Sequence, residues 1–375
     1  MAVATEAAVP RTRETDPRSL RSGIGWGVFW VGLLALILGA AHNARPPGDL
    51  ADRVKNPQAV PAMASPAFNY HWMARLEAGT WVAMAILVVA CVVIWRRHPK
   101  HPILLMAIAA EGIVWLDPVM NWAPYAVYNP QLWHWPETWP LASLAPTVEP
   151  FIVVGYVTFY LGPYFPAIWI LRRIQRSRPV TSFVWRHPLI SLGLITYAVG
   201  FVFDAFLEIF CIRAGLYVYS QVVPFGSVFT GKPYQFPLLW ESSLVTLVMI
   251  PAAVLLYRDD TGKTVAEKLT QRARLFPRRP AMGLFVVMFA VLNVAYLTYG
   301  LGFAIMRWSK VSTSLACPWP YPQEKVYDPQ GFYAKAGQPG PYLPGNWDGW
   351  ESLQSGRPHV ATAPSGKCSP TSVPH

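Results

Sequence analysis

The sequence predicts an all-α fold: a polytopic membrane bundle of about seven transmembrane helices, with the N-terminus in the cytoplasm. The chain of 375 residues is 53% hydrophobic. Only 14% of its residues are charged, against about 25% in ordinary soluble domains. Apolar runs of about 20 residues, the length needed to cross a bilayer, recur along the chain. We therefore expect an integral membrane protein, located in the bacterial plasma membrane.

Seven apolar runs are long enough to span a membrane. The first could pass for a signal peptide, but LGAAHNARPP is only a fair cleavage site, so we interpret this run as a retained anchor. A basic cytoplasmic tail, 1–23, precedes the membrane domain, 24–306, and an irregular Pro-, Gly- and Trp-rich tail, 307–375, follows it outside the cytoplasm. The expected spans are 24–41, 77–95, 103–122, 151–171, 189–212, 238–257 and 281–306.

The positions of Lys and Arg set the expected orientation. The N-terminal tail and the loops 96–102, 172–188 and 258–280 hold 19 of the 31 Lys and Arg residues. The other 12 are spread over longer segments on the opposite side. Because cytoplasmic loops carry the excess of positive charge, the N-terminus is predicted inside and the C-terminal tail outside. The same clustering accounts for the net charge of +11 without a nucleic-acid partner.

Two segments on the predicted outer side, 123–150 and 213–237, are rich in proline and aromatic residues. Trp133, His134 and Trp135 stand side by side in the first of them. One interpretation is an aromatic belt at the membrane–water interface. The other is an aromatic lid over a cavity that opens outward, in which these three side chains bind the substrate.

Carboxyl side chains gather at one predicted depth, which is the strongest functional signal in the sequence. Asp117 and Asn121 lie in the outer half of the third run, and Asp204 and Glu208 share one face of the fifth. Acids inside a membrane usually face a bundle interior or a wet cavity and mark function. Three further acids lie at or near the same depth and are expected to contact the substrate: Glu111, Glu149 and Glu241.

A structural role is the alternative for these acids. Asp204 or Glu208 could hydrogen-bond a neighbouring helix, and Glu149 and Glu241 could be interfacial residues in water. No Lys or Arg lies inside the third to sixth runs to neutralise the acids. Three basic residues in the predicted outer segments are possible partners: Arg75, Arg213 and Lys232.

Acids that lie close together in a low dielectric do not all ionise at once, which separates the roles of acid and base. Asp204, the deeper of its pair, is the expected general acid. Glu208, one turn nearer the outer water, is the expected base or cation stabiliser. Asp117 is the third expected catalytic group and could replace either.

Motifs for nucleotide chemistry and for nucleophilic catalysis do not occur in the chain. There is no phosphate-binding P-loop, no glycine-rich dinucleotide loop and no nucleophile elbow. The four cysteines have no metal-ligand spacing, although Cys317 and Cys368 could pair in an oxidising compartment. We therefore expect neither a metal nor a cofactor.

Four segments resemble the AveC-like spirocyclase family, multi-span proteins of polyketide pathways and their relatives. They are DPVMNW, YAVYN, FVFDAFLEIF and YRDDTGKTVAEKL, and the resemblance covers roughly residues 77–325. It implies closure of a spiroketal, which some members follow with dehydration. The positions that match the family's pattern are Asp117 to Asn121, Tyr128 and Asn129, and Asp204 and Glu208. Tyr128 and Asn129 are expected to bind the substrate.

The predicted function is a membrane-embedded acid–base cyclase or dehydratase that acts on a polyketide-like dihydroxy ketone. Its expected partners are this hydrophobic small molecule and the lipid bilayer. A terpene-type cyclase is one alternative, because it also starts from a buried acid and stabilises its cation with aromatic rings. A proton-coupled transporter or small-molecule binding protein is another. A retinal protein is excluded because the last run, 281–306, contains no lysine.

Overall fold

The computed structural model describes residue 31 and residues 70–314, and the account below concerns the unit that begins at residue 47. The N-terminal tail, nearly all of the expected first span, and the C-terminal tail after residue 314 lie outside the described residues. Cys317, Cys368 and Lys232 therefore lie outside them as well. Short gaps occur at 125, 130–131, 137–138, 140, 143–144, 152–154, 220, 231–233, 310 and 312.

Five helices in the described part of the chain are long and apolar enough to cross a membrane, and each coincides with an expected span. The prediction of a mainly helical membrane protein is confirmed. The count of seven spans and the cytoplasmic N-terminus stay predictions. The five candidate spans are Arg75–Arg97, Pro102–Met120, Pro188–Arg213, Leu238–Leu256 and Pro280–Met306.

Proline marks the start of three of these helices. Helices α4 (Pro102–Glu111), α9 (Pro188–Arg213) and α12 (Pro280–Trp308) all begin with it. The first turn of a helix suits proline because an N–H there has no partner within the helix. The other two long helices are α3 (Tyr70–Arg97) and α10 (Leu238–Leu256).

The expected fourth span, 151–171, is two helices rather than one. Helix α6 (Gly155–Leu161) ends before Gly162, and α7 (Tyr164–Arg176) begins after Pro163. Proline lacks an N–H for the helical ladder and its ring crowds the preceding turn, so the helix breaks there. Neither piece alone has the roughly 20 residues that a spanning helix needs.

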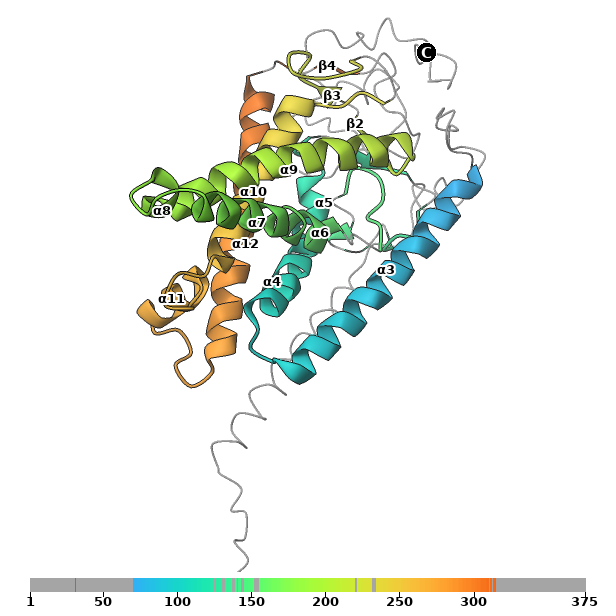
Figure 1. Ribbon diagram of the computed structural model, residues 1–375. Helices are drawn as coiled ribbons and strands as arrows, with labels where there is room; N and C mark the ends of the chain where they lie inside the picture. Colours follow the sequence, from blue (N-terminus) through green and yellow to red (C-terminus); the bar gives the residue numbers. More distant parts are fainter. Residues whose placement is uncertain are drawn as a thin grey trace, which may run out of the picture. The chain divides into compact units, whose positions relative to one another are not determined.

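Helix α9 is the element against which much of the bundle packs. It contacts α10 and α7, and a single-turn helix, α8 (Phe183–Arg186), links α7 to it (Figure 1). Helix α10 contacts α12, and α12 contacts α4. Helix α3 makes few contacts, mainly with α4.

The seam between α9 and α10 is close because small residues line it. A Cβ atom at Gly200 would lie 2.8 Å from Cγ2 of Thr246 and 3.0 Å from Sδ of Met249. Only glycine leaves room for α10 at this level of α9. Thr196 of α9 and Ser242 of α10 are also buried polar residues on these two helices.

Two short sheets depart from the all-α expectation. Strands β1 (Ala126–Tyr128) and β2 (Tyr217–Tyr219) pair antiparallel, with Tyr128 opposite Tyr217. Their AVY and YVY sequences have the β-branched and aromatic residues that favour strands. The pairing fastens the loop after α5 to the segment that follows α9. Strands β3 (Gln221–Val222) and β4 (Thr313–Ser314) form the second sheet.

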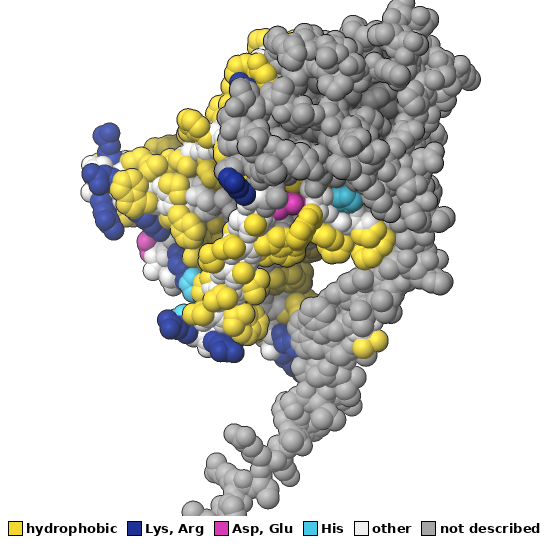
Figure 2. All heavy atoms as spheres, turned by 90° about the vertical axis from the view of Figure 1, so that its right-hand side faces the viewer, with side chains coloured by type: hydrophobic (Ala, Val, Ile, Leu, Met, Phe, Trp, Pro, Cys, Tyr) yellow, Lys and Arg dark blue, Asp and Glu magenta, His cyan; other side chains and the backbone are white. Residues whose placement is uncertain are grey.

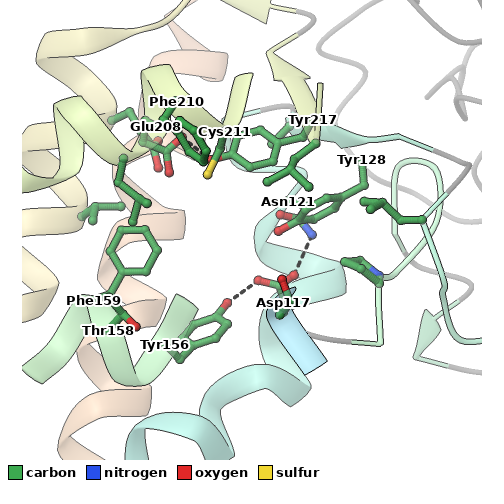
Figure 3. Close-up of a pocket in the computed structure, with 18 of the residues that line it drawn as sticks. Asp117, Asn121, Tyr128, Tyr156, Thr158, Phe159, Glu208, Phe210, Cys211 and Tyr217 are labelled. Atoms are coloured by element: carbon green, nitrogen blue, oxygen red, sulfur yellow. Dashed lines mark hydrogen bonds between the residues drawn. The ribbon is translucent and has the colours of Figure 1, made fainter. Parts of the chain in front are cut away.

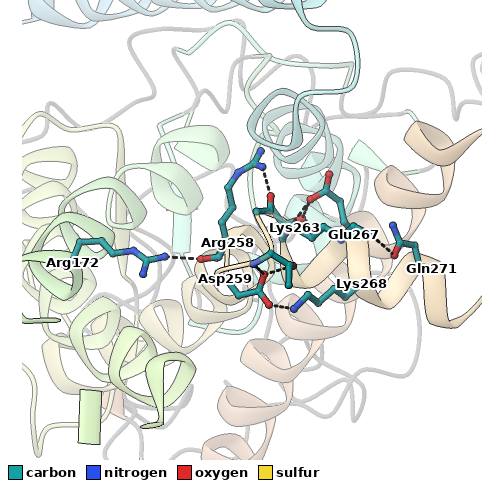
Figure 4. Close-up of polar contacts among 10 residues, drawn as sticks. Arg172, Arg258, Asp259, Lys263, Glu267, Lys268 and Gln271 are labelled. Carbon is teal, nitrogen blue, oxygen red and sulfur yellow. Dashed lines mark hydrogen bonds and ion pairs between the residues drawn. The ribbon is translucent and has the colours of Figure 1, made fainter. Parts of the chain in front are cut away.

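Polar contacts order the loop between α10 and α12, which contains the segment YRDDTGKTVAEKL (Figure 4). Thr264 and Glu267 form a capping box at the start of α11 (Val265–Arg272). Arg258 donates to the carbonyl oxygen of Gly262 over 2.8 Å, and Arg172 of α7 donates to the carbonyl oxygen of Arg258 over 2.6 Å. The contacts observed here give this family-like segment a structural role.

Hydrophobic side chains cover much of the described surface in Figure 2, with Lys and Arg side chains at its margins. Exposed apolar residues of α9 include Leu194, Val202 and Phe206, and Phe206 is 76% exposed. Side chains of this kind are costly in water and suited to lipid, in agreement with spans that cross a bilayer.

Candidate functional site

A cavity of about 630 Å³ lies among α3, α6, α9, α10 and α12 and is closed partly by strands β1 and β2. Apolar and aromatic side chains make up most of its wall. A few polar groups interrupt it, which is the usual composition of a small-molecule site. Its acidic lining residues are Glu77, Asp117, Glu208 and Glu241.

Asp117 reaches this cavity because the third span changes its winding just before it. The segment η2 (Gly112–Leu116) is a 3-10 helix, and α5 (Asp117–Met120) resumes the α-helix with Pro118 in its first turn. A 3-10 stretch inside a long helix often accompanies a functional site. Asp117 is nevertheless buried, with 3% of its surface exposed.

Three side chains donate hydrogen bonds to the carboxyl group of Asp117. Nδ2 of Asn121 donates to Oδ2 over 3.0 Å, and the Tyr156 hydroxyl donates to Oδ1 (Figure 3). The Tyr296 hydroxyl reaches Oδ1 over 3.4 Å and lies 2.7 Å from the Tyr156 hydroxyl. With both oxygens accepting, the arrangement suits the ionised carboxylate.

Glu149 lies against Asp117 and has no hydrogen-bond donor among the described residues. It follows the loop after β1 and is buried. Burial raises the pKa of Glu149 well above its ordinary value, and the adjacent charge of Asp117 raises this pKa further. The two carboxyl groups can hydrogen-bond each other only if one holds a proton, and Glu149 is the one whose surroundings favour the neutral form.

Glu208 of α9 lies on another side of the cavity from Asp117 (Figure 3). Tyr217 and Tyr219 each donate a hydroxyl hydrogen to its Oε2 atom over 2.7 Å. Strand β2 presents both tyrosines, because residues two apart on a strand point to the same face. Burial raises the pKa of Tyr217 and of Tyr219 well above the ordinary value, so both phenols stay neutral donors.

Glu241 lies in the first turn of α10, and its carboxyl group lines the cavity together with those of Asp117 and Glu208. The Tyr299 hydroxyl lies 2.9 Å from its Oε1 and 3.0 Å from its Oε2. The Tyr219 hydroxyl, which donates to Glu208, is also within hydrogen-bond range of Glu241. Tyr219 therefore links two carboxyl groups from different helices.

Asp204 shares a face of α9 with Glu208 but is not part of the cavity wall. Its exposed fraction is 0%, and neither carboxyl oxygen has a hydrogen-bond partner among the described residues. The polar groups near it are Glu208, one turn along α9, and Ser242 of α10. Asp204 therefore lies behind Glu208 as seen from the cavity.

Two of the other expected substrate-binding residues line the cavity. The Tyr128 ring packs edge-on against the Tyr217 ring, with centroids 5.3 Å apart. Burial, and then the nearby charge of Asp117, raises the pKa of Tyr128 well above its ordinary value. Trp133 is 60% exposed and stands at the edge of the cavity, where its backbone N–H donates to Glu77.

Five of the expected substrate-binding residues do not line the cavity: Glu149, described above, and four others. Asn129 donates to the carbonyl oxygen of Gly215 over 3.0 Å and so holds the end of α9 to β1. Trp135 packs its ring on other aromatic rings, and His134 hydrogen-bonds the backbone beside it. Glu111 of α4 accepts a hydrogen bond from the backbone of α6.

The basic residues that were expected to pair with the acids lie in different places. Arg75 lines the cavity from α3. Arg213 lies over the Tyr234 ring, 3.8 Å from its centroid, in a cation–π contact. Among the described residues, no Lys or Arg forms an ion pair with Asp117, Glu208 or Glu241, so hydrogen bonds and shared protons must stabilise these three groups.

Sequence reasoning missed the tyrosines. They come from α6, β2 and α12, and they donate to the carboxyl groups of Asp117, Glu208 and Glu241. A signal was present: YVY follows the fifth span, and two tyrosines stand three apart, on one helix face, in the last span. The residues concerned are Tyr156, Tyr217, Tyr219, Tyr296 and Tyr299.

In the described part of the chain, no three His, Cys, Asp or Glu side chains gather closely enough to hold a metal ion. The chemistry available at the cavity wall is that of carboxyl groups and phenols. Such groups can donate a proton, accept one and stabilise a cation in a water-poor site.

A family model described as "Spirocyclase AveC-like" matches residues 95–327, more than half of the chain. Four of the five candidate spans lie within the matched region, and Arg75–Arg97 lies mostly before it. No curated protein and no solved structure matches this chain.

Proposed function

Because this chain belongs to the AveC-like spirocyclase family, we propose that it closes a spiroketal on a polyketide-like dihydroxy ketone by acid–base catalysis inside the membrane. Family membership supports a spirocyclase-type function in general. One observation carries the specific proposal: Asp117 and Glu208, each held by phenol donors, face a single largely apolar cavity.

Glu208 is the general acid of this proposal. Both of its phenol partners donate to Oε2, which leaves Oε1 to carry a proton. Glu208 also lies near Asp204 and Glu241, and three close carboxyl groups without an ion pair do not ionise together. A proton on Oε1 of Glu208 is available to a leaving hydroxyl in the cavity.

Asp117 is the general base. Its two oxygens accept hydrogen bonds from Tyr156 and Asn121, and neutral Glu149 lies beside it. These contacts favour its ionised form, which can take a proton from an attacking hydroxyl. The same negative charge stabilises a cation formed beside it.

The reaction begins when one hydroxyl of the substrate adds to the ketone and gives a hemiketal. Glu208 protonates the hemiketal hydroxyl. The carbon–oxygen bond then breaks, a water molecule departs, and an oxocarbenium ion remains. The second hydroxyl attacks that carbon while Asp117 removes its proton. The products are the spiroketal and one water molecule, and one proton has moved from Glu208 to Asp117. Removal of a neighbouring C–H proton from the same cation would give dehydration instead.

Asp204 acts through Glu208 in this proposal and does not touch the substrate. A carboxyl group this deeply buried, one turn from Glu208, favours a proton on the pair. The wall residues Asn121, Tyr128, Trp133 and Glu241 contact the substrate. The other expected binding residues hold the wall in place: Glu111, Asn129, His134, Trp135 and Glu149.

The cavity wall restricts the pose of the substrate. It consists of side chains from several helices, so the substrate is held in one pose and attack occurs from one face of the cation. The cavity is bounded by candidate spans, so a hydrophobic substrate reaches it from the bilayer. The bacterial plasma membrane is the location that we propose.

The test uses a synthetic, achiral ketone that carries one δ-hydroxyl on each side of the carbonyl group. Membranes containing the protein should convert it to a spiroketal lighter by one water molecule and enriched in one enantiomer at the spiro centre. Membranes without the protein should give the spontaneous racemate. Asp117→Asn and Glu208→Gln should each cut the rate by roughly 10²–10⁴-fold, the usual contribution of a general acid or base.

Asp260→Asn is the matched control, because Asp260 is an exposed carboxyl group in the loop before α11. Its rate should equal that of the wild type at matched expression. A racemic product formed at the background rate by wild-type membranes would contradict the proposed function.

The aromatic wall supports a second candidate, a terpene-type cyclase. Phe159, Phe210 and Tyr160 line the cavity with the tyrosines already described, and aromatic faces stabilise carbocations. The same membranes incubated with a polyprenyl substrate should give no cyclic hydrocarbon if the spiroketal proposal holds.

A further inference from the structure

A consequence of the proposed function, on which this inference rests, is that each turnover leaves the two catalytic groups in the wrong protonation states. Asp117 ends with a proton and Glu208 ends without one. The enzyme can act again only after a proton has returned to Glu208. Both groups are buried among candidate spans, where bulk water has little access.

Hydrogen bonds extend from Asp117 along the cavity wall. Tyr156 of α6 donates to Asp117, and its hydroxyl lies 2.7 Å from that of Tyr296 on α12. The two rings meet edge-on with centroids 5.7 Å apart. A proton leaving Asp117 therefore has two successive phenol oxygens within reach.

Hydrogen bonds also extend from Glu208. Tyr219 donates to Glu208 over 2.7 Å and is within hydrogen-bond range of Glu241. Tyr299 of α12 in turn lies 2.9 Å from Oε1 of Glu241. A proton arriving at Tyr299 can thus reach Glu208 through one carboxyl group and one phenol.

The series of hydrogen bonds from Asp117 and the series from Glu208 come together on α12. The rings of Tyr296 and Tyr299 stack with centroids 5.6 Å apart, one helical turn from each other. Both residues line the cavity, and the proposal places one water molecule there as the bridge between their hydroxyl groups. We propose that the phenols of Tyr156, Tyr296, Tyr299 and Tyr219, with the Glu241 carboxyl, form a proton-return belt from Asp117 to Glu208.

The transfer is balanced at every hop. Each oxygen of the belt accepts a proton from one neighbour and passes its own proton to the next. The net change is one O–H bond broken at Asp117 and one formed at Glu208. The hydroxyl groups then rotate back, and no electron, oxidant or other reactant is needed.

Tyr299→Phe tests the belt with the dihydroxy ketone probe, because it removes one hydroxyl from the middle and leaves Asp117 and Glu208 in place. With enzyme in excess, the single-turnover rate should equal that of the wild type. With substrate in excess, the steady-state rate should fall roughly tenfold or more, because proton transfer then limits turnover. Formate or imidazole buffer, as a small mobile proton carrier, should restore much of the steady-state rate.

Tyr197→Phe is the matched control, because its hydroxyl bonds Ser243 over 2.9 Å outside the cavity and it should leave both rates unchanged. Tyr299→Leu removes the same hydroxyl group with a smaller apolar side chain, in case Tyr299→Phe does not fold. Three outcomes would overturn the belt: unchanged steady-state rates in both variants, an equal fall in the single-turnover rate, or a rate loss that the buffers do not reverse. Failure of the wild type itself would instead reject the proposed function.

Discussion

Glu149 lies against Asp117, and no described N–H or O–H group reaches either carboxyl oxygen of Glu149. The pair resembles two carboxyl groups that share one proton. Such an arrangement ties the charge state of the proposed base to a second residue that comes from a loop, and it makes the stability of the protein depend on pH.

The first prediction follows from this pair. Burial, and then the charge of Asp117, raises the pKa of Glu149 above the ordinary 4.5. Above about pH 4.5 the unfolded chain loses this proton while the folded protein keeps it, so the free energy of unfolding falls as pH rises. One proton contributes a slope of about 1.4 kcal/mol per pH unit, up to the raised pKa.

Glu149→Gln should remove that part of the slope, because its amide stays neutral at every pH. The measurement is thermal unfolding of the detergent-purified protein between pH 4.5 and pH 8. Asp260→Asn, which removes an exposed carboxyl group, should leave the slope of the wild type. Equal slopes in Glu149→Gln and the wild type would contradict the shared proton.

The second prediction separates Asp204 from Glu208. Asp204 lies outside the cavity wall, so Asp204→Asn should slow turnover of the dihydroxy ketone less than Glu208→Gln does and should leave KM unchanged. The double variant should be little slower than Glu208→Gln alone, because the two residues act as a unit. Steady-state kinetics of the three variants at matched expression test this. A larger loss with Asp204→Asn would make Asp204 the acid.

The third prediction concerns the contact between α9 and α10. Gly200→Ala would place a Cβ atom 2.8 Å from Thr246, so it should lower the free energy of unfolding by about 1–3 kcal/mol, as overpacking does. Gly193→Ala is the control on the same helix, since its nearest neighbour would be Ile250 at an ordinary 3.5 Å. Thermal unfolding in detergent should rank Gly200→Ala below Gly193→Ala, and the reverse order would rule out the close seam.

The fourth prediction concerns topology. The clustering of Lys and Arg puts the loop after residue 97 in the cytoplasm and the loop around residue 135 outside. Reporter fusions after residues 100 and 135 should give opposite signals, inside and outside respectively. The same signal from both fusions would show that Arg75–Arg97 and Pro102–Met120 do not place these loops as the charge rule predicts.

The sequence by itself determined the class of the protein, the five described spans and the family. Length and hydropathy are local properties, so runs such as 189–212 and 281–306 could be identified without knowing what they pack against. The expectation that Asp117, Glu208 and Glu241 lie at a common depth came from the same runs. The break at Pro163 and the pairing of β1 with β2 were missed, although AVY, YVY and Pro163 carried local signals for them.

Only the tertiary structure decided which of these acids face one another. Asp204 and Glu208 share a helix face, yet only Glu208 reaches the cavity, because α10 approaches Gly200 closely and covers the turn that holds Asp204. The phenol partners of the acids come from α6, β2 and α12, which are far apart in the chain. Hydrogen bonds between such segments depend on how helices pack, and no pattern within one segment contains that information.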